Sequence, residues 1–268
     1  MAYLYETHLH TKESSACGVS RGREYIAKYL DLGYTGIIIT DHFFRGNCAV
    51  ERYHSWEKWV HKFCRGYEEA REEGARRGLD VFFGWEETFS GDDYLIYGLG
   101  KEWLLEHPEV VRWTRKEQFD EVRRYGGCVV QAHPFRQHSH IHCVRLSTGC
   151  VDAVEAANAG NDDPSYDALA WEYAKKLNLP VTAGSDIHYV NDVRPSVVFG
   201  VYMEKRMETI GDYVAAIRGN PGGNAIKGLK VPPGRFDLRG NERVMLPVDI
   251  RDSQDKSIGK NIAEFFKR

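Results

Sequence analysis

The chain alternates short apolar stretches, rich in β-branched and aromatic residues, with longer amphipathic stretches that carry charge. The apolar stretches predict strands at Tyr3–Thr7, Gly36–Thr40, Val81–Glu86, Tyr94–Leu99, Cys128–Ala132, Ala153–Ala157, Pro180–Ala183 and Val197–Val201. Helical patterns lie between them, at Arg23–Leu32, Val50–Arg77, Lys116–Tyr125, Ser165–Leu177 and Glu208–Arg218. A strand followed by a helix, repeated about six times, predicts a parallel sheet whose strands are joined by crossover helices.

A closed α/β barrel is the simplest arrangement of such a sheet in a chain of 268 residues. The alternative is an open doubly wound sheet, but no glycine-rich nucleotide-binding loop follows the first predicted strand. We expect one barrel domain over residues 1–218. A C-terminal extension over residues 219–268 is rich in Gly, Pro and polar residues, and we expect it to be partly irregular with one short hairpin.

Charge and composition argue against several classes of protein. The net charge is −3, from 39 acidic and 36 basic residues, so nothing marks a general binder of nucleic acid or of membrane surfaces. The longest clean apolar run, Gly36 to Thr40, is too short to cross a bilayer, and the N-terminus has no signal core. The six cysteines show no CxxC pair and read as reduced thiols, so we expect a cytoplasmic protein.

Histidines and carboxylates gather where the predicted strands end. His8 and His10 close the first strand, and residues two apart in an extended chain point to the same side. The ends of later strands hold Asp41 and His42, Glu86 and Glu87, His133, and Asp186 and His188. A parallel barrel brings these ends around one mouth, and imidazole with carboxylate suits Zn, Mn or Fe. The sequence therefore predicts a multi-metal site at the C-terminal ends of the strands.

Taken alone, each motif has an ordinary explanation, because caps and strand ends commonly carry Asp, Glu or an exposed histidine. Three further histidines, His138, His140 and His142, alternate along one loop, but nothing apolar brackets them, so we expect loop histidines. The placement of five separate motifs at five strand ends favours a shared metal site over these explanations.

The loop after Cys128–Ala132 carries the sequence His133-Pro134-Phe135-Arg136. Proline restricts the residue before it, which predicts an extended backbone at His133. The guanidinium of Arg136 offers a fork of donors suited to phosphate or carboxylate. We therefore expect Arg136 to bind the substrate and to act in catalysis.

The order HLH, TDH, GWE, AHP and GSDIH resembles the PHP family, named for polymerase and histidinol phosphatase domains, from about Tyr5 to Val201. The resemblance implies a distorted (β/α)7 TIM-like barrel and two or three divalent ions (Zn, Mn or Fe) that hydrolyse phosphoesters. The ligand positions of the family fall on His8, His10, His42, Glu86, His133, Asp186 and His188. Glu86 matches the carboxylate that bridges two ions, which leaves Glu87 beside the site or at the surface.

Two positions depart from the family's pattern. Asp93 stands where the family usually has a histidine ligand, and we expect it to ligate in its place. His107 is the alternative, although its polar loop indicates a structural or exposed role. The family often has Asp or His five or six residues after the second histidine, where this chain has Ser15 and Ala16. Either Glu13 substitutes there, or the third ion is held more weakly.

The resemblance implies a metal-dependent phosphoesterase in which a metal-bridging hydroxide attacks phosphorus. In this mechanism Arg136 neutralises charge on the phosphoryl oxygens, and Asp41 orients His42 or passes a proton. We expect a small phosphorylated substrate, either a phosphomonoester or a short nucleotide, and no general nucleic-acid or membrane partner.

Three alternatives stay open. A 5′-directed oligonucleotide exonuclease would need stacking aromatics, and the candidates beside the motifs, which are more ordinarily core residues, are Trp85, Phe89, Phe135 and Tyr189. A metal-holding regulatory or structural module would lack turnover. A metal-dependent amidohydrolase usually has a bridging lysine, and no lysine is suitably placed here. The native substrate and the oligomeric state also stay open.

Overall fold

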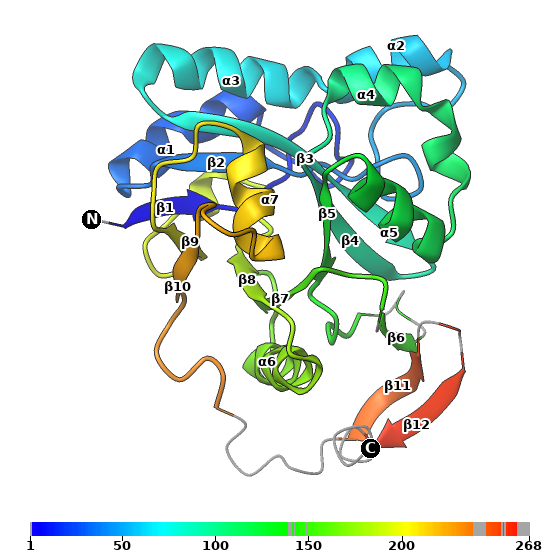
Figure 1. Ribbon diagram of the computed structural model, residues 1–268. Coiled ribbons are helices and arrows are strands. Elements are labelled where there is room, and N and C mark those ends of the chain that lie inside the picture. Colours follow the sequence, from blue (N-terminus) through cyan, green and yellow to red (C-terminus); the bar gives the residue numbers. More distant parts are fainter. Residues whose placement is uncertain are drawn as a thin grey trace.

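The computed structural model describes residues 2–138, 141, 143–147, 149–237, 245–252, 254 and 256–261. Its main sheet has nine strands in the order β10-β9-β1-β2-β3-β4-β5-β7-β8. The sheet curves until its two ends approach each other, with β8 in contact with β9 and β10 (Figure 1). The sheet therefore forms a nearly closed barrel, which confirms the predicted α/β barrel class.

The five strands that lead into the predicted motifs, together with β7, run in one direction around this barrel. They are β1 (Tyr3–Glu6), β2 (Gly36–Ile39), β3 (Asp80–Phe89), β5 (Cys128–Ala132), β7 (Ala153–Asn158) and β8 (Val181–Gly184). Two strands run the other way, β4 (Asp92–Tyr97) between β3 and β5, and β9 (Gly200–Met203) beside β1. A regular (β/α)7 repeat is not confirmed, because the turn at Ser90 and Gly91 joins β3 to β4 with no helix between them.

The helices lie mostly where the amphipathic stretches predict them. They are α1 (Tyr25–Asp31), α2 (Trp56–Phe63), α3 (Arg65–Arg77), α4 (Lys101–Glu106), α5 (Arg115–Arg124), α6 (Pro164–Leu177) and α7 (Ile210–Arg218), with short 3-10 helices at Gly22–Glu24, Pro108–Arg112 and Val190–Asp192. The expected helix over Val50–Arg77 begins only at Trp56 and is interrupted at Cys64. Within the described residues, no helix is long and apolar enough to span a membrane.

Alternating side chains of the strands build the core on both faces of the sheet. Ile37 and Ile39 of β2 are buried with residues of α1 on the outside, whereas Ile38 is buried inside the barrel. The interior cluster includes Tyr97 and Tyr213, whose rings meet edge to face with centroids 5.0 Å apart. Tyr213 belongs to α7, which thereby packs against the amino-terminal ends of the parallel strands and leaves the opposite ends open for a site.

The described part of the C-terminal extension contributes strands to two sheets. β10 (Ile226–Lys230) pairs with β9 in the main sheet. β11 (Met245–Asp252) pairs antiparallel with β12 (Ser257–Asn261) and parallel with β6 (Cys143–Leu146), which makes a small second sheet. Arg235 lies in the segment between β10 and β11, and its side chain forms an ion pair with Asp167 of α6.

Candidate metal centre

The structure brings all the predicted ligands together at the carboxyl ends of the parallel strands. These eight candidate ligands are His8, His10, His42, Glu86, Asp93, His133, Asp186 and His188. Their ligand atoms form four sets of three in which all atoms lie within 4.8 Å of one another. The sets are His8/His10/Glu86, His8/His133/Asp186, Glu86/Asp93/His133 and His10/His42/His188. Because several residues belong to two sets, the arrangement suits neighbouring ions that share ligands.

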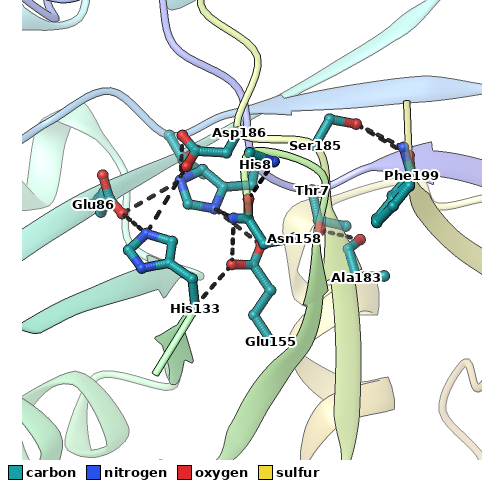
Figure 2. Close-up of polar contacts among 12 residues, drawn as sticks. Thr7, His8, Glu86, His133, Glu155, Asn158, Ala183, Ser185, Asp186 and Phe199 are labelled. Carbon is teal, nitrogen blue, oxygen red and sulfur yellow. Dashed lines mark hydrogen bonds and ion pairs between the residues drawn. The ribbon is translucent and has the colours of Figure 1, made fainter. Parts of the chain in front are cut away.

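Outer hydrogen bonds orient two imidazoles at the centre, and Figure 2 shows the one at His8. His8 Nδ1 lies 2.9 Å from Oε1 of Glu155 on β7, so the ring donates Nδ1–H to this carboxylate; in its neutral form, the form that ligates metals, it directs the Nε2 lone pair inward. The Ser15 hydroxyl donates to Asp41 at 2.6 Å, and its oxygen is therefore free to accept Nδ1–H of His10 at 3.1 Å. The two Nε2 atoms then face each other at 3.1 Å, an arrangement that a cation stabilises.

His42 and His188 form a set of three ligand atoms with His10. His188 donates Nδ1–H to the carbonyl oxygen of Asp186 at 2.8 Å, which leaves its Nε2 available. Its ring stacks on that of His10, with centroids 4.4 Å apart. His42 Nδ1 and Glu86 Oε2 are 2.7 Å apart, yet neither of these buried atoms makes a hydrogen bond. Unpartnered buried polar atoms cost free energy, and a shared cation would satisfy both, so the residues fit a metal centre.

The carboxylate of Glu86 lies between two pairs of imidazoles. Oε1 is 3.2 Å from His133 Nε2 and 3.4 Å from His8 Nε2, while Oε2 faces His42 and lies 3.6 Å from His10 Nε2. Burial alone would raise the pKa of Glu86, but the charges of His42 and His8 hold it well below its usual range. Glu86 is therefore an ionised carboxylate, with Oε1 toward His8 and His133 and Oε2 toward His10 and His42.

Charge at the centre favours bound cations. Burial alone would lower the pKa of His8, but Glu155, Asp186 and Glu86 raise it well above its usual value. For His10, burial together with His42 and His188 holds the pKa well below its usual value. The carboxylates thus attract positive charge to the centre, whereas His10 stays neutral, which is the form that ligates metals.

Asp93 reaches the centre from the antiparallel strand β4. It belongs to one set with Glu86 and His133, and its Oδ1 accepts a hydrogen bond from Thr88 Oγ1 at 2.6 Å. Burial, followed by the charge of Glu86, raises the pKa of Asp93. The neighbouring Glu87 points elsewhere: it is buried and pairs with Arg45 at 3.1 Å, rather than lying at the surface.

The expectation of an extended backbone at His133 is wrong. Its φ is +28°, in the left-handed region, despite the proline that follows. Tertiary contacts hold this conformation: the amide of His133 donates to Glu155 Oε2 at 3.2 Å, and its carbonyl accepts from the Arg136 amide at 3.0 Å. Asp186 also has a positive φ, +56°, and His and Asp are among the residue types that tolerate this region.

Asp41 lies behind His10 rather than beside the ring of His42. Its carboxylate accepts hydrogen bonds from the Thr11 amide at 2.6 Å, the Thr11 hydroxyl at 2.7 Å and the Ser15 hydroxyl at 2.6 Å. Burial raises the pKa of Asp41 to about 7, against the lowering effect of these donors. The contact that Asp41 makes toward the centre therefore runs through Ser15 to His10.

A pocket of about 600 Å³ opens above the candidate ligands, with Arg45, Asn47 and Arg136 among its lining residues. Arg136 Nη1 donates to Asp186 Oδ2 at 2.7 Å, and Nη2 and Nε donate to the side chains of Asn158 and Asn161. These contacts hold the guanidinium at the pocket wall beside a candidate ligand. Its expected contact with phosphate stays a prediction.

Glu13 lies outside the four sets of ligand atoms. Its carboxylate accepts a hydrogen bond from the Gly22 amide at 3.2 Å and lines a separate pocket. The residue that borders the centre instead is Cys17, whose side chain interacts with His188 and His42. Burial alone would raise the pKa of the Cys17 thiol, but these two histidines lower it to about 6. Cys17 is not predicted from the sequence, because it lies seven residues after His10, outside the positions at which the PHP family usually has a ligand.

Among the described residues, no other histidine belongs to the four sets. His138 is exposed at the pocket rim, and His140 and His142 fall outside the described residues. His107 stacks on Trp103 with centroids 4.3 Å apart and bonds to Glu109, which agrees with a structural role.

The four aromatic residues beside the motifs do not line the pocket. Trp85, Phe89 and Phe135 are buried, and only Tyr189 is exposed. In the described part of the chain, the pocket wall therefore offers no ring from this group for stacking on a base.

Comparison with known proteins gives related folds. The PHP_C family, described as PHP-associated, matches residues 164–193, which include α6, β8, Asp186 and His188. No curated protein matches the chain. A two-domain protein from Bacteroides vulgatus, containing a predicted PHP-like metal-dependent phosphoesterase, has a similar structure with a TM-score of 0.61 and 17% identity. The match covers 81% of this chain and 64% of that protein, so this chain spans less than two thirds of its length.

Two other solved structures share the fold over most of their length. PsfC from Pseudomonas syringae has a TM-score of 0.57 and 15% identity, over 88% of this chain and 94% of PsfC. A candidate metal-dependent phosphoesterase from Bifidobacterium adolescentis has a TM-score of 0.50 and 16% identity, over 80% of this chain and 96% of that protein.

Fold and site together define an α/β barrel with a cluster of potential metal ligands at the carboxyl ends of its strands. The PHP-associated match over residues 164–193 agrees with the resemblance that the order of motifs shows, and the similar structures share the barrel fold.

Proposed function

We propose that this protein is a metal-dependent phosphoesterase that hydrolyses a small phosphomonoester or a nucleotide. The observation that carries the proposal is the position of Glu86, whose two oxygens face different pairs of imidazoles beneath a pocket that contains Arg136. The three sets of ligand atoms that include a carboxylate would hold at least two ions close together. The similar structures named as phosphoesterases support this reaction class.

The side chains of the pocket have distinct tasks in this reaction. Divalent ions, when bound, supply an acidified water as nucleophile and positive charge for the phosphoryl oxygens. Arg136 adds donors at the pocket wall, and a guanidinium can bind a phosphoryl group through two parallel bonds. Glu155 and Ser15 fix the rings of His8 and His10 through Nδ1, which keeps both Nε2 atoms directed at the centre.

The pocket favours a small substrate over an oligonucleotide. Its volume of about 600 Å³ lies within the range of small-molecule sites, about 300–1,000 Å³. Arg45 lies in the wall as a second guanidinium, packed over the ring of Phe89 at 3.8 Å. The aromatic residues that could stack on bases do not line this pocket, and a 5′-directed exonuclease would need such contacts.

The test is hydrolysis of p-nitrophenyl phosphate by protein supplied with Zn, Mn or Fe, followed by nucleotides, histidinol phosphate, short oligonucleotides and a panel of amides. We expect activity on phosphomonoesters that a chelator abolishes and added metal restores. Metal-loaded protein that turns over none of the phosphate esters contradicts the proposal. Hydrolysis of amides alone would favour an amidohydrolase, and no turnover at all a regulatory module.

A further inference from the structure

Asn158 is a fully buried amide side chain at the end of β7, beside Glu155 and His8 (Figure 2). Its Nδ2 donates to Oε2 of Glu155 at 2.8 Å, and its Oδ1 accepts from Nη2 of Arg136 at 2.6 Å. One side chain thus contacts both the carboxylate that orients His8 and the guanidinium that lines the pocket.

The partners of Asn158 fix which way its amide group points. Two donors, the Arg136 guanidinium and the Gly160 amide, meet Oδ1, whereas the Glu155 carboxylate, an acceptor, meets Nδ2. Nδ2 also lies 3.4 Å from His8 Nδ1, but that nitrogen donates to Glu155, so the carboxylate accepts from both groups. The position therefore uses a donor and an acceptor, of which aspartate would supply only the acceptor and alanine neither.

The donor side of Asn158 holds a carboxylate that serves two candidate ligands. Glu155 is buried and accepts Nδ1–H of His8 at 2.9 Å through Oε1 and the amide of His133 at 3.2 Å through Oε2. Asn158 donates to the same Oε2 and so restricts the rotation of this carboxylate. Removal of a group that orients a metal ligand typically weakens metal binding by about 10- to 100-fold.

The acceptor side of Asn158 helps to hold the guanidinium of Arg136. Asp186 accepts from Nη1 at 2.7 Å and Asn161 from Nε at 2.9 Å, so these three side chains use three of the five N–H donors and leave two for a phosphoryl group. The packing is close, because a Cβ added at Gly160 would lie 3.0 Å from both Arg136 Nη2 and Asn158 Oδ1. Hydrogen bonds and packing together keep the guanidinium in place.

We propose that Asn158 is a positioning residue that aligns the guanidinium of Arg136 with the metal centre by holding Arg136 and Glu155 through one amide group. The inference rests on the proposed phosphoesterase function. A misplacement of about 1 Å can cost about 100-fold in rate, so a single group that fixes both partners matters to the reaction. The backbone of Asn158 is itself held, since its amide donates to Asp167 at 3.2 Å and its carbonyl accepts from Arg235 at 3.3 Å.

Asn158→Asp and Asn158→Ala separate the two contacts, because aspartate keeps the acceptor for Arg136 and alanine does not. We expect both variants to bind Zn²⁺ at least about tenfold more weakly, measured by competition with a chelator. At saturating metal, we expect Asn158→Asp to keep KM for p-nitrophenyl phosphate near that of the wild type. Asn158→Ala should raise KM and the inhibition constant of inorganic phosphate about tenfold, the size of one hydrogen bond to a charged group.

Asn224→Ala is the matched control. Asn224 is also buried, and its amide group bonds to backbone atoms of Lys205 and Ala225, residues that do not line the pocket. This variant should lose stability in denaturant unfolding but keep its zinc affinity and KM.

Asn158 variants that lose only stability, as Asn224→Ala should, overturn the proposal, and so do aspartate and alanine variants with the same KM. If Asn158→Asp does not fold, Asn158→Ala still tests both contacts: unchanged zinc affinity or unchanged KM overturns the proposal, and loss of both supports it. Wild-type protein that binds no zinc or hydrolyses no phosphate ester overturns the proposed function, on which the role of Asn158 rests.

Discussion

Glu86 is the residue on which the proposed chemistry most depends. Its carboxylate lies no more than 3.6 Å from four imidazoles, those of His8, His10, His42 and His133. We expect Glu86→Gln to bind fewer ions and to lose hydrolysis by more than about 100-fold, because even partners outside the ligand shell cost 10- to 100-fold. Elemental analysis and steady-state kinetics measure both effects.

Glu13→Gln is the matched control for this substitution, because Glu13 lies in a separate pocket and bonds to the Gly22 amide. It should keep its metals and its activity. If Glu86→Gln retained full metal content and rate, the bridging role of Glu86 would be wrong.

A substitution at Arg136 can distinguish a role in catalysis from a purely structural role. It donates to Asp186 and to two asparagines, so lysine can keep one ion pair but loses the fork of donors. We expect Arg136→Lys to retain its metals and to lose about 3 kcal/mol of transition-state stabilisation, roughly 100-fold in kcat. Steady-state kinetics and metal analysis of the same variant distinguish the two roles. If Arg136 were purely structural, kcat of the lysine variant would stay near that of the wild type.

The end of β8 shows how an element can position a ligand that belongs to another strand. A Cβ added at Gly184 would lie 2.5 Å from His8 Cβ and 2.6 Å from Glu155 Oε1. Gly184→Ala should therefore displace the His8–Glu155 pair, destabilise the fold by about 1–3 kcal/mol and weaken metal binding. Denaturant unfolding and metal titration measure these effects.

Gly228→Ala is the control, because an added Cβ at Gly228 in β10 would meet no atom within 4 Å. It should change neither stability nor metal affinity appreciably. Equal behaviour of the two alanine variants would show that the close approach of β8 to His8 is unimportant.

The elements also show why the sequence predicts ligands better than their surroundings. The candidate ligands are histidines and carboxylates that come directly after apolar strand patterns, so their positions relative to the strands predict them. Glu155 and Ser15, which orient the rings of His8 and His10, are ordinary residue types on other segments, and no local pattern marks them. Strand β4 has the same apolar pattern as a parallel strand, and only the tight turn at Ser90 and Gly91 reveals its reversed direction.

At the scale of the whole molecule, the sequence predicts the barrel but not how the C-terminal extension is attached. The alternation of strands and helices is a repeated local signal. The pairing of β11 with β6 joins residues about a hundred positions apart and has no such signal. The same holds for the ion pair between Arg235 and Asp167, which links the extension to α6.

We expect Arg235→Ala to lower the free energy of unfolding by about 3 kcal/mol, because it leaves the buried Asp167 carboxylate without its partner. Burial already raises the pKa of Asp167, and losing Arg235 raises it further. The folded variant then binds a proton more tightly than the unfolded chain does. The deficit should therefore grow as pH rises through the pKa of Asp167 in the folded wild type, which is itself raised above its usual value, and shrink at lower pH.

Denaturant unfolding at several pH values measures this deficit. Arg76→Ala is the control, because its exposed pair with Glu73 on α3 contributes little. A deficit in Arg235→Ala that did not change with pH would contradict the role of Asp167.

The left-handed backbone at His133 also bears on how this sequence can change over generations. A residue before proline rarely adopts a positive φ, so His133 holds this conformation at a cost that glycine would largely avoid. A lineage released from selection on the centre would thus gain stability by losing this histidine early. Descendants with glycine before Pro134 should keep the barrel and bind fewer ions, and inactivity in such a lineage would be hard to reverse.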